Sequence, residues 1–223
     1  MTILGQGVVA IWNGIAPEGR EKFYEWHNRE HMPERVGIPG FLRGRRYIAK
    51  YGHPEYFTLY EAASPEVLSG QDYFNRLNNP TPWTRDVVSN YFRDASRGVC
   101  RVKFSQACGD GGYLLTLQFG PAATREVDLD TALRHRLLPP IIDITGVLGV
   151  HLCVADKAAS DVETAERKGR SVAIPKWLIM IEACTPEAAD SGCDAMLSAG
   201  LQDAGAERTF ERGLYVLQNS RSK

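Results

Sequence analysis

An internal repeat is the feature that most restricts how this chain can fold. Residue types recur 106 positions later in the pairs Gly14/Gly120, Ala16/Ala122, Pro33/Pro139, Ile38/Ile144, Gly40/Gly146, Leu42/Leu148 and Ala49/Ala155. Two further blocks follow in the same order, where residues 56–66 align with 177–187 and residues 97–99 align with 212–214. Ungapped blocks that recur in order indicate two copies of one structural unit. The two copies can therefore be compared position by position.

Each copy carries the same predicted order of strands and helices. In the first copy, β-rich runs cover residues 8–13, 41–51, 56–62 and 99–104. A helix is expected from Pro17 to the Gly-Ile-Pro-Gly breaker, and a second from Ser64, a predicted N-cap, to Leu77, resuming over 83–92. This βαββαβ order is that of a ferredoxin-like unit. The sequence thus predicts an α+β protein with two tandem units, residues 1–108 and 109–223.

The antiparallel sheet of such a unit has helices on one face only. The other face needs a partner, because an apolar sheet face is stable only when it is buried. The two sheets of this chain are therefore expected to pack on each other and curl into a barrel. The second copy inserts residues 157–171 between its second and third strands, and the Ala, Ser, Asp, Glu and Lys there predict an exposed and mobile loop.

Composition argues against several classes of function. The net charge of -1, from 26 basic and 27 acidic residues, disfavours a general nucleic-acid or anionic-membrane binder, which needs clustered cations. No apolar run approaches the roughly 20 residues of a membrane span, and no secretion signal is evident. Five cysteines without a C-x-x-C pair favour neither a disulfide framework nor a thiolate zinc site. We expect a cytoplasmic protein without nucleic-acid or membrane partners.

The first helix of the first copy carries the residues that suggest chemistry. At about 100° per residue, one of its faces comprises Phe23, Trp26, His27, Glu30 and His31. The second copy has Leu133 where the first has His27, and Leu137 where the first has His31. Burying an imidazole without a partner costs on the order of a few kcal/mol. The two histidines are therefore expected to line a cavity, bind a ligand or satisfy each other through a neighbour such as Glu30.

Four interpretations of this pair stay open. The plainest is a structural hydrogen-bond network. Residues 27–31 also match H-x-x-E-H, the inverted zinc-protease pattern, although no third ligand is evident. Imidazoles at i and i+4 could share a metal ion without proteolysis, and an imidazole with a pKa near 6.5 could transfer protons at neutral pH. We adopt the last interpretation, in which His27 is the general acid or base and His31 and Glu30 orient it or relay protons.

Aromatic and basic residues around this face are candidates for the walls of a ligand site. They are Trp12, Asn13, Trp26, Arg43, Arg45, Arg46, Tyr47, Tyr60 and Trp83. Because side chains alternate along a strand, Arg43 and Arg45 face away from Arg46, and one of the three is expected to hold a carboxylate. Cross-strand aromatic packing and solvent-facing ion pairs are the plainer alternatives for these residues.

One motif resembles a known superfamily. It runs through Trp26-His27, residues 31–35 (His-Met-Pro-Glu-Arg), residues 38–41 (Ile-Pro-Gly-Phe) and residues 45–47 (Arg-Arg-Tyr). This pattern is similar to that of the dimeric α/β-barrel superfamily, in particular of EthD-like and related uncharacterised proteins. The resemblance implies a barrel of two ferredoxin-like units, here fused in tandem, with a pocket between helices and sheet in each. The second copy keeps little of the motif, which implies that its pocket is vacant or filled with leucine.

Members of this superfamily include cofactor-free monooxygenases, muconolactone-type isomerases, polyketide cyclases and haem-binding or haem-degrading proteins, so the resemblance leaves the reaction open. The leading hypothesis is an enzyme that applies His-based acid–base chemistry to a small organic acid or aromatic molecule, as an isomerase, cyclase, dehydratase or cofactor-free oxygenase. It needs no cofactor, although haem or a metal ion at His27 or His31 stays open. The alternative is a non-catalytic ligand- or haem-binding or oligomerisation protein. Further self-association of the fused pair also stays open.

Overall fold

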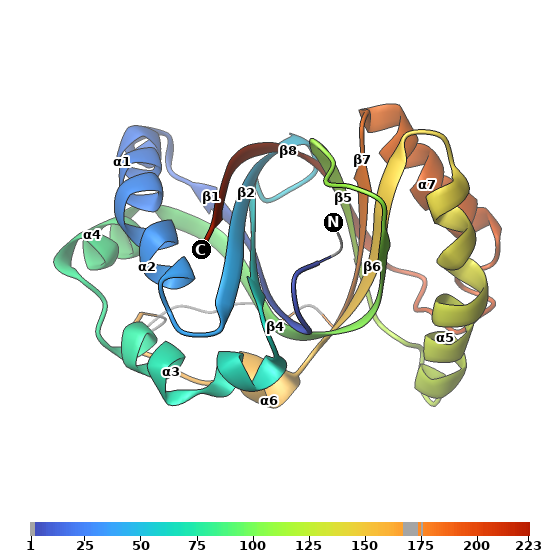
Figure 1. Ribbon diagram of the computed structural model, residues 1–223, viewed down its shortest axis with the longest axis horizontal. Helices are drawn as coiled ribbons and strands as arrows, with labels where there is room; N and C mark the ends of the chain where they lie inside the picture. The colour runs from blue at the N-terminus through green and yellow to red at the C-terminus, as the bar shows by residue number, and fades with distance from the viewer. Residues whose placement is uncertain (1–2, 167–173, 175) are drawn as a thin grey trace.

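The computed structural model describes residues 3–166, 174 and 176–223, in which eight strands close into one antiparallel barrel (Figure 1). The strands are β1 (Gly7–Ile15), β2 (Phe41–Tyr51), β3 (Tyr56–Ala62), β4 (Phe92–Ala107), β5 (Tyr113–Phe119), β6 (Val147–Ala155), β7 (Trp177–Ala183) and β8 (Glu211–Ser222). The predicted bounds of β2 and β3 are confirmed, whereas β4 is longer at both ends than expected.

The order of the strands shows how the repeat builds the barrel. The first four strands stand in the order β4-β1-β3-β2, and the last four in the equivalent order β8-β5-β7-β6. Two antiparallel seams join these halves, one between β2 and β8 and one between β4 and β6. The predicted fold class, two tandem ferredoxin-like units whose antiparallel sheets form one barrel, is confirmed.

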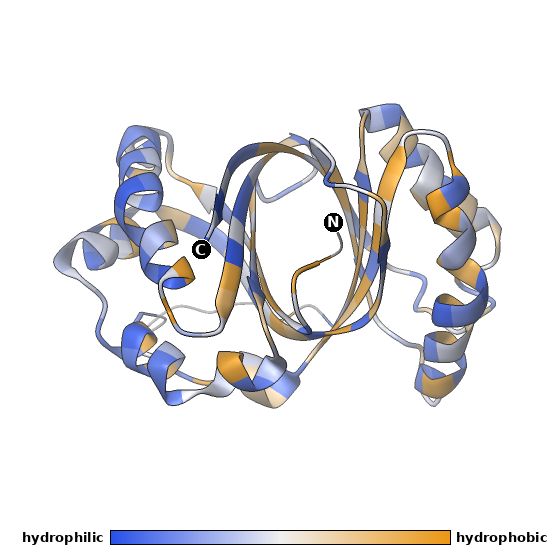
Figure 2. Ribbon diagram, in the orientation of Figure 1, coloured by the Kyte–Doolittle hydropathy of each residue, from blue (hydrophilic) through white to orange (hydrophobic). Residues whose placement is uncertain are grey.

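Helices cover the outside of the barrel on two opposite sides (Figure 1). On the first unit they are η1 (Pro17–Gly19), α1 (Arg20–Trp26), η2 (His27–His31), α2 (Met32–Val36), η3 (Pro65–Ser69), α3 (Gln71–Asn78) and α4 (Pro82–Tyr91). The second unit contributes α5 (Glu126–Ala132), η4 (Leu133–Leu137), η5 (Pro139–Asp143), α6 (Lys157–Ser160) and α7 (Pro186–Ser198). Their outer surfaces are largely hydrophilic (Figure 2). Within the described part of the chain, no helix is long and apolar enough to cross a membrane.

The barrel and the helices bury both faces of the central strands. All seven residues of β3 are buried. Phe57 and Leu59 point into the barrel and join its core, while Tyr60 and Ala62 point outward and pack beneath the helices. Alternating strand side chains thus serve two different cores. An apolar residue on such a strand can face either core, so hydrophobicity alone does not reveal its direction.

One turn of the long helix of each unit is a π turn, namely η2 in the first unit and η4 in the second. In η2 the backbone N–H of Met32 donates to the carbonyl of His27, five residues earlier. Such turns often occur at functional sites. Here the second unit has the same turn with leucines in place of the histidines, so the π turn belongs to the repeated fold and does not itself indicate function.

The predicted N-cap at Ser64 is not present. Its side chain makes no capping hydrogen bond in the described structure, and residues 65–69 form only the short turn η3 before Gly70 adopts an extended conformation. The helix α3 begins after this glycine. In the second unit the equivalent Thr185 does cap α7, because its hydroxyl accepts a hydrogen bond from the backbone of Ala188 at 3.2 Å.

The inserted segment of the second unit was expected to be an exposed loop, and its described part, residues 157–166, differs from this expectation. It begins with α6, in which Ser160 is only 1% exposed. The backbone N–H of Val99 on β4 donates to the Ser160 hydroxyl at 2.9 Å, and Ala159 packs against a core cluster of the first unit. The segment therefore covers the other unit. Residues 167–171 of the predicted loop lie outside the described residues.

Candidate functional site

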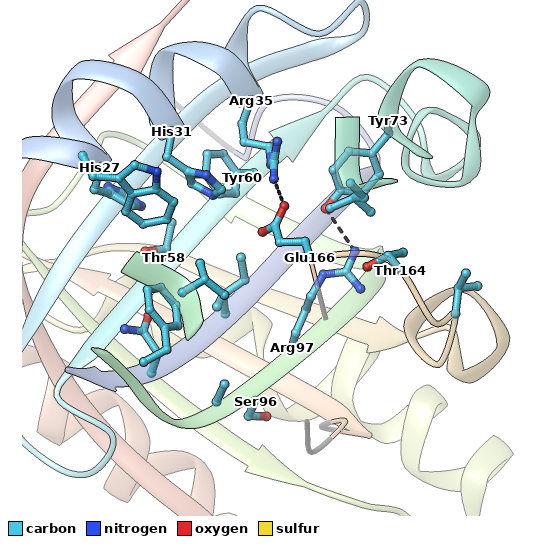
Figure 3. Close-up of a pocket in the computed structure, with 18 residues that line it drawn as sticks. His27, His31, Arg35, Thr58, Tyr60, Tyr73, Ser96, Arg97, Thr164 and Glu166 are labelled. Carbon is cyan, nitrogen blue, oxygen red and sulfur yellow. Dashed lines mark hydrogen bonds and ion pairs between the residues drawn. The ribbon is translucent and has the colours of Figure 1, made fainter. Parts of the chain in front are cut away.

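A cavity lies between the first helices and the outward face of the sheet in the first unit (Figure 3). It leaves about 80 Å³ for the centres of water-sized molecules, far more than the 10–15 Å³ that one water needs. The helices contribute Trp26, His27, His31 and Arg35 to its lining, and the strands β1 and β3 contribute Asn13, Thr58 and Tyr60. These strand residues share one face because they alternate along their strands.

The far wall of the cavity comes from elements that are distant in sequence. Tyr73 of α3 and Arg97 of β4 lie there, and Arg97 donates a hydrogen bond to the Tyr73 hydroxyl at 3.0 Å. Thr164 and Glu166 arrive from the inserted segment of the second unit. The second unit thus completes a site whose remaining walls belong to the first.

His27 is buried and has a defined hydrogen-bond partner. Nη1 of Arg46 lies 3.2 Å from its Nδ1. A guanidinium can only donate, so Nδ1 must accept and the ring proton must sit on Nε2. Burial, followed by the charges of Arg46 and Arg35, lowers the pKa of His27 well below its usual value. His27 is therefore a neutral imidazole that can donate a hydrogen bond from Nε2.

His31 lies one turn further along the helix and is in a different state. Its Nδ1 is buried and has no hydrogen-bond partner in the described structure. The ring of Trp26 covers it, with centroids 4.3 Å apart. Burial, then the charges of Arg35 and His27, lowers the pKa of His31 well below 6.5. His31 is therefore also neutral, but no partner at Nδ1 fixes the position of its proton.

The hydroxyl of Tyr60 is a second buried polar group without a partner in the described part of the chain. Its ring lies over Gly44, where an added Cβ would come within 2.9 Å of Tyr60 Cε1. Burial raises the pKa of this hydroxyl above its usual value, so it stays protonated. Unsatisfied buried polar groups cost about 1–3 kcal/mol each. Two residues that line one cavity, His31 and Tyr60, thus each carry such a group.

Besides burial, the positive charge of Arg35 lowers the pKa of both histidines. It is 3% exposed and forms ion pairs with Glu34, at 3.4 Å, and with Glu166. Glu34 also pairs with Arg76 at 2.7 Å. Arg35 thus holds a positive charge in the cavity wall, balanced chiefly by a carboxylate from the other unit.

Five of the candidate residues from the sequence lie around this cavity, namely Asn13, Trp26, His27, His31 and Tyr60. Glu30 does not. Its carboxylate accepts hydrogen bonds from the hydroxyls of Thr81, at 2.6 Å, and Thr84, at 3.3 Å. Both hydroxyls belong to the start of α4, so the Glu30 carboxylate is directed to that helix.

Four other candidates lie inside the barrel and not at the cavity. Trp12 packs against Phe57 in the barrel core, and Tyr47 belongs to the same core. Arg43 and Arg45 also face inward, where both bind the buried carboxylate of Glu61. The expected split of Arg43 and Arg45 from Arg46 is present, but neither of the first two can reach a ligand in the cavity.

The two remaining candidates are also absent from the cavity lining. Arg46 contacts His27 from the side and donates to the side chain of Asn28 at 2.9 Å. Trp83, near the start of α4, is 37% exposed. Arg46 therefore acts on the site through His27, and Trp83 does not cover it.

The second unit fills the equivalent space with hydrocarbon. The positions of Ile11, Asn13, His27, His31, Arg35, Thr58 and Tyr60 are taken there by Leu117, Phe119, Leu133, Leu137, Ile141, Ile179 and Ile181. All seven replacements belong to one buried core cluster. The polar cavity is therefore a departure of the first unit from the repeated fold.

Sequence reasoning missed several polar residues of the site, among them Arg35, Tyr73, Arg97 and Glu166. Arg35 could have been found, because the second copy has Ile141 in its place, the same contrast that identified the histidines. Tyr73, Arg97 and Glu166 carried no such signal. Arg97 aligns with another arginine, and Glu166 lies in an insertion that has no counterpart in the first copy.

No protein-family model matches the sequence, and no curated protein matches it. Solved structures do. An anthrone oxidase-like protein superposes with a TM-score of 0.64 at 13% identity, over 97% of this chain and 92% of its own. A protein provisionally named a monooxygenase, from Fusobacterium nucleatum, gives 0.63 at 9% identity, over 98% and 95%. This chain is a fused dimeric α/β barrel. The fold implied by the sequence motif is thereby confirmed.

The fused barrel also resembles a haem-binding protein from Thermus thermophilus, with a TM-score of 0.51 at 12% identity, over 96% of this chain and 92% of the other. This likeness concerns the fold alone, so haem at His27 or His31 stays a prediction. Among the described residues, no group of three or more His, Cys, Asp or Glu side chains could hold a metal ion.

Proposed function

We propose that the fused barrel is an enzyme that binds a small, largely apolar or aromatic molecule in the first-unit cavity and moves a proton between it and His31. The observation that carries this proposal is the convergence of two neutral, buried imidazoles on a cavity that the second unit fills with leucine and isoleucine. An apolar pocket with a few convergent polar groups and perturbed pKa values is typical of an active site.

The two histidines have different roles in this proposal. His31 is the base, because it lines the cavity, is uncharged at neutral pH and has no described partner at Nδ1 that fixes the position of its proton. His27 is a hydrogen-bond donor, because Arg46 occupies its Nδ1 and leaves the proton on Nε2. The expectation from the sequence differs, since there His27 is the acid or base and His31 orients it or relays protons.

Proton abstraction would use these groups together. The base takes a proton from a carbon next to a carbonyl, the C–H bonding electrons stay on the substrate, and negative charge develops on the carbonyl oxygen. His27 Nε2 and the Tyr60 hydroxyl are the donors available to that oxygen. The developing anion offsets the cost of charging His31 in a buried site. Return of the proton to another atom would complete an isomerisation, and elimination or ring closure could begin with the same step.

The structural neighbours support a small-molecule enzyme and do not specify the reaction. One is named as anthrone oxidase-like and another as a monooxygenase. An oxygenation by this site would require dioxygen as the oxidant after proton abstraction. We therefore propose the proton transfer, which isomerase, cyclase, dehydratase and cofactor-free oxygenase chemistry can all share, as the common step.

Deuterium exchange tests the proposal without knowledge of the natural substrate. Aromatic ketones such as 1-indanone and anthrone are incubated with the protein in D₂O, and deuterium at the acidic carbon is measured by NMR. The wild-type protein should accelerate exchange of at least one probe, and His31→Leu should reduce the rate to that of buffer, a loss of about 10²-fold or more. Equal rates for wild type and His31→Leu would contradict the role of His31.

A matched control lies at the equivalent turn of the second unit. His135 is exposed on η4, so His135→Leu makes the same chemical change away from the cavity and should leave the exchange rate unchanged. A non-catalytic ligand carrier is the alternative function. It would bind the probes, as shown by a rise in Tm, without accelerating deuterium exchange.

A further inference from the structure

Arg35 and Glu166 form an ion pair in the cavity wall that joins the two units. Arg35 comes from α2, beside the histidines, and its side chain is 3% exposed. Glu166 comes from the inserted segment of the second unit and is 17% exposed. Figure 3 shows the Glu166 carboxylate pointing toward the Arg35 guanidinium, on the side of Arg35 that faces the cavity.

The segment that carries Glu166 is hydrogen-bonded to the end of α3 in the first unit. The backbone N–H of Glu166 donates to the carbonyl of Leu77 at 3.1 Å, and that of Ala165 donates to the Asn78 side chain at 3.1 Å. Both acceptors lie at the end of α3. These contacts bring the Glu166 carboxylate to Arg35, although the two residues are 131 positions apart in the chain.

The formal charges of the cavity lining sum to a positive value, which favours an anionic ligand. The formally charged members of this lining are Arg35, Arg97 and Glu166, since both histidines are neutral. Without the Glu166 carboxylate, a buried guanidinium would lose its principal counter-charge, which costs several kcal/mol. A ligand carboxylate could replace that of Glu166 on Arg35 with no change in net charge, and bidentate binding of carboxylates is typical of arginine.

We propose that the natural ligand is a small aromatic or alicyclic carboxylate, whose carboxylate displaces that of Glu166 on Arg35. This rests on the proposed function of the cavity and adds the class of its substrate. The ring of the ligand lies against Trp26 and Tyr60, and its carboxylate is held on the side away from His27. The Glu166 side chain thus occupies the position of the ligand carboxylate until a ligand arrives.

The test compares benzoate with benzamide, which has the same shape and no charge. Binding is measured by calorimetry and by the rise in Tm of the full chain. Glu166→Gln removes the competing charge and should bind benzoate about tenfold more tightly than wild type, because the binding-competent state no longer has to release an ion pair. Benzamide should bind both proteins weakly and alike.

Two further variants serve as controls. Glu34→Gln removes the other carboxylate beside Arg35, which pairs with Arg76 and lies outside the cavity lining, so benzoate affinity should stay within about twofold of wild type. The double variant Arg35→Met/Glu166→Gln removes both charges of the ion pair, so no buried charge is left without its partner, and the protein should fold. It should bind benzoate no better than benzamide.

Two results would overturn the proposal. One is weaker or unchanged benzoate binding in Glu166→Gln, which would make Glu166 a permanent part of the wall. The other is equal binding of benzoate and benzamide by every variant. The failure of this proposal can be distinguished from the failure of the proposed function. A carboxylate preference that depends on Arg35 would support the ligand class, while absent deuterium exchange in the same protein would reject the proton transfer.

Discussion

Replacing Glu61 with Gln should lower the free energy of unfolding by about 3–5 kcal/mol, because it removes a charge from a buried ion network. Glu61 is fully buried inside the barrel and accepts four hydrogen bonds. They come from Arg43 Nε at 2.9 Å, Arg43 Nη2 at 3.0 Å, Arg45 Nε at 3.0 Å and the backbone N–H of Leu4 at 2.7 Å. Gln keeps the size of the side chain but leaves two buried guanidiniums short of a counter-charge.

The network extends from one unit to the other. Arg45 also binds Glu182 of β7 through two hydrogen bonds of 3.0 and 3.1 Å. Burial opposes the ionisation of Glu182, but the neighbouring His151, whose Nε2 lies 3.3 Å from the carboxylate, and the charge of Arg45 lower its pKa to about 2. Glu61 and Glu182 occupy equivalent positions in the repeat. The loss of Glu61 should therefore weaken the contact between the units as well as the first unit.

Urea denaturation of wild type and Glu61→Gln measures this effect. Glu211→Gln, an exposed site on β8, provides a control that should change the free energy of unfolding by no more than about 0.5 kcal/mol. A Glu61→Gln protein within 1 kcal/mol of wild type would mean that the barrel interior admits water to these charges and that the network is not a dry one.

The double variant His27→Leu/His31→Leu should be more stable than wild type at acidic pH, with a gap that widens as the pH falls. Both histidines have folded-state pKa values well below 6.5, chiefly because of burial. Below pH 6.5 the unfolded chain therefore binds protons that the folded chain does not, and the wild-type protein loses stability. Above pH 6.5 the two states hold the same number of protons at these sites, and the effect vanishes.

Between pH 7 and pH 5 this linkage should amount to about 3 kcal/mol for the two residues together. Urea unfolding at several pH values measures this difference in the free energy of unfolding. The variant should fold, because the second unit already has leucine at the two equivalent positions. His135→Leu should give a pH profile parallel to that of wild type. If the double variant also ran parallel to wild type, the histidines would be charged in the folded protein, and His31 could not be the neutral base.

Much of the fold could be predicted because its signals are local. Gly and Pro breakers and β-rich runs gave the bounds of β2 and β3, and the recurrence of blocks in order gave two units of one topology. The histidine pair was also detectable, because leucines at the same helix positions of the other copy showed what packing alone would place there. Comparison of the copies thus identified the cavity residues on the first helix but not those on α3, β4 and the inserted segment.

The sequence by itself determined the repeat, the order of the helices and strands, and the helix turn in which histidines replace the leucines of the other copy. Only the tertiary structure decided which way Trp12 and Tyr47 point, because strands in a closed barrel under helices are buried on both faces and either direction satisfies an apolar side chain. It placed Arg43 and Arg45 inside the barrel, where the Glu61 carboxylate binds both. It also decided the partner of Arg35, since an ion pair between residues 131 positions apart forms only where folding brings an insertion of one unit onto the other.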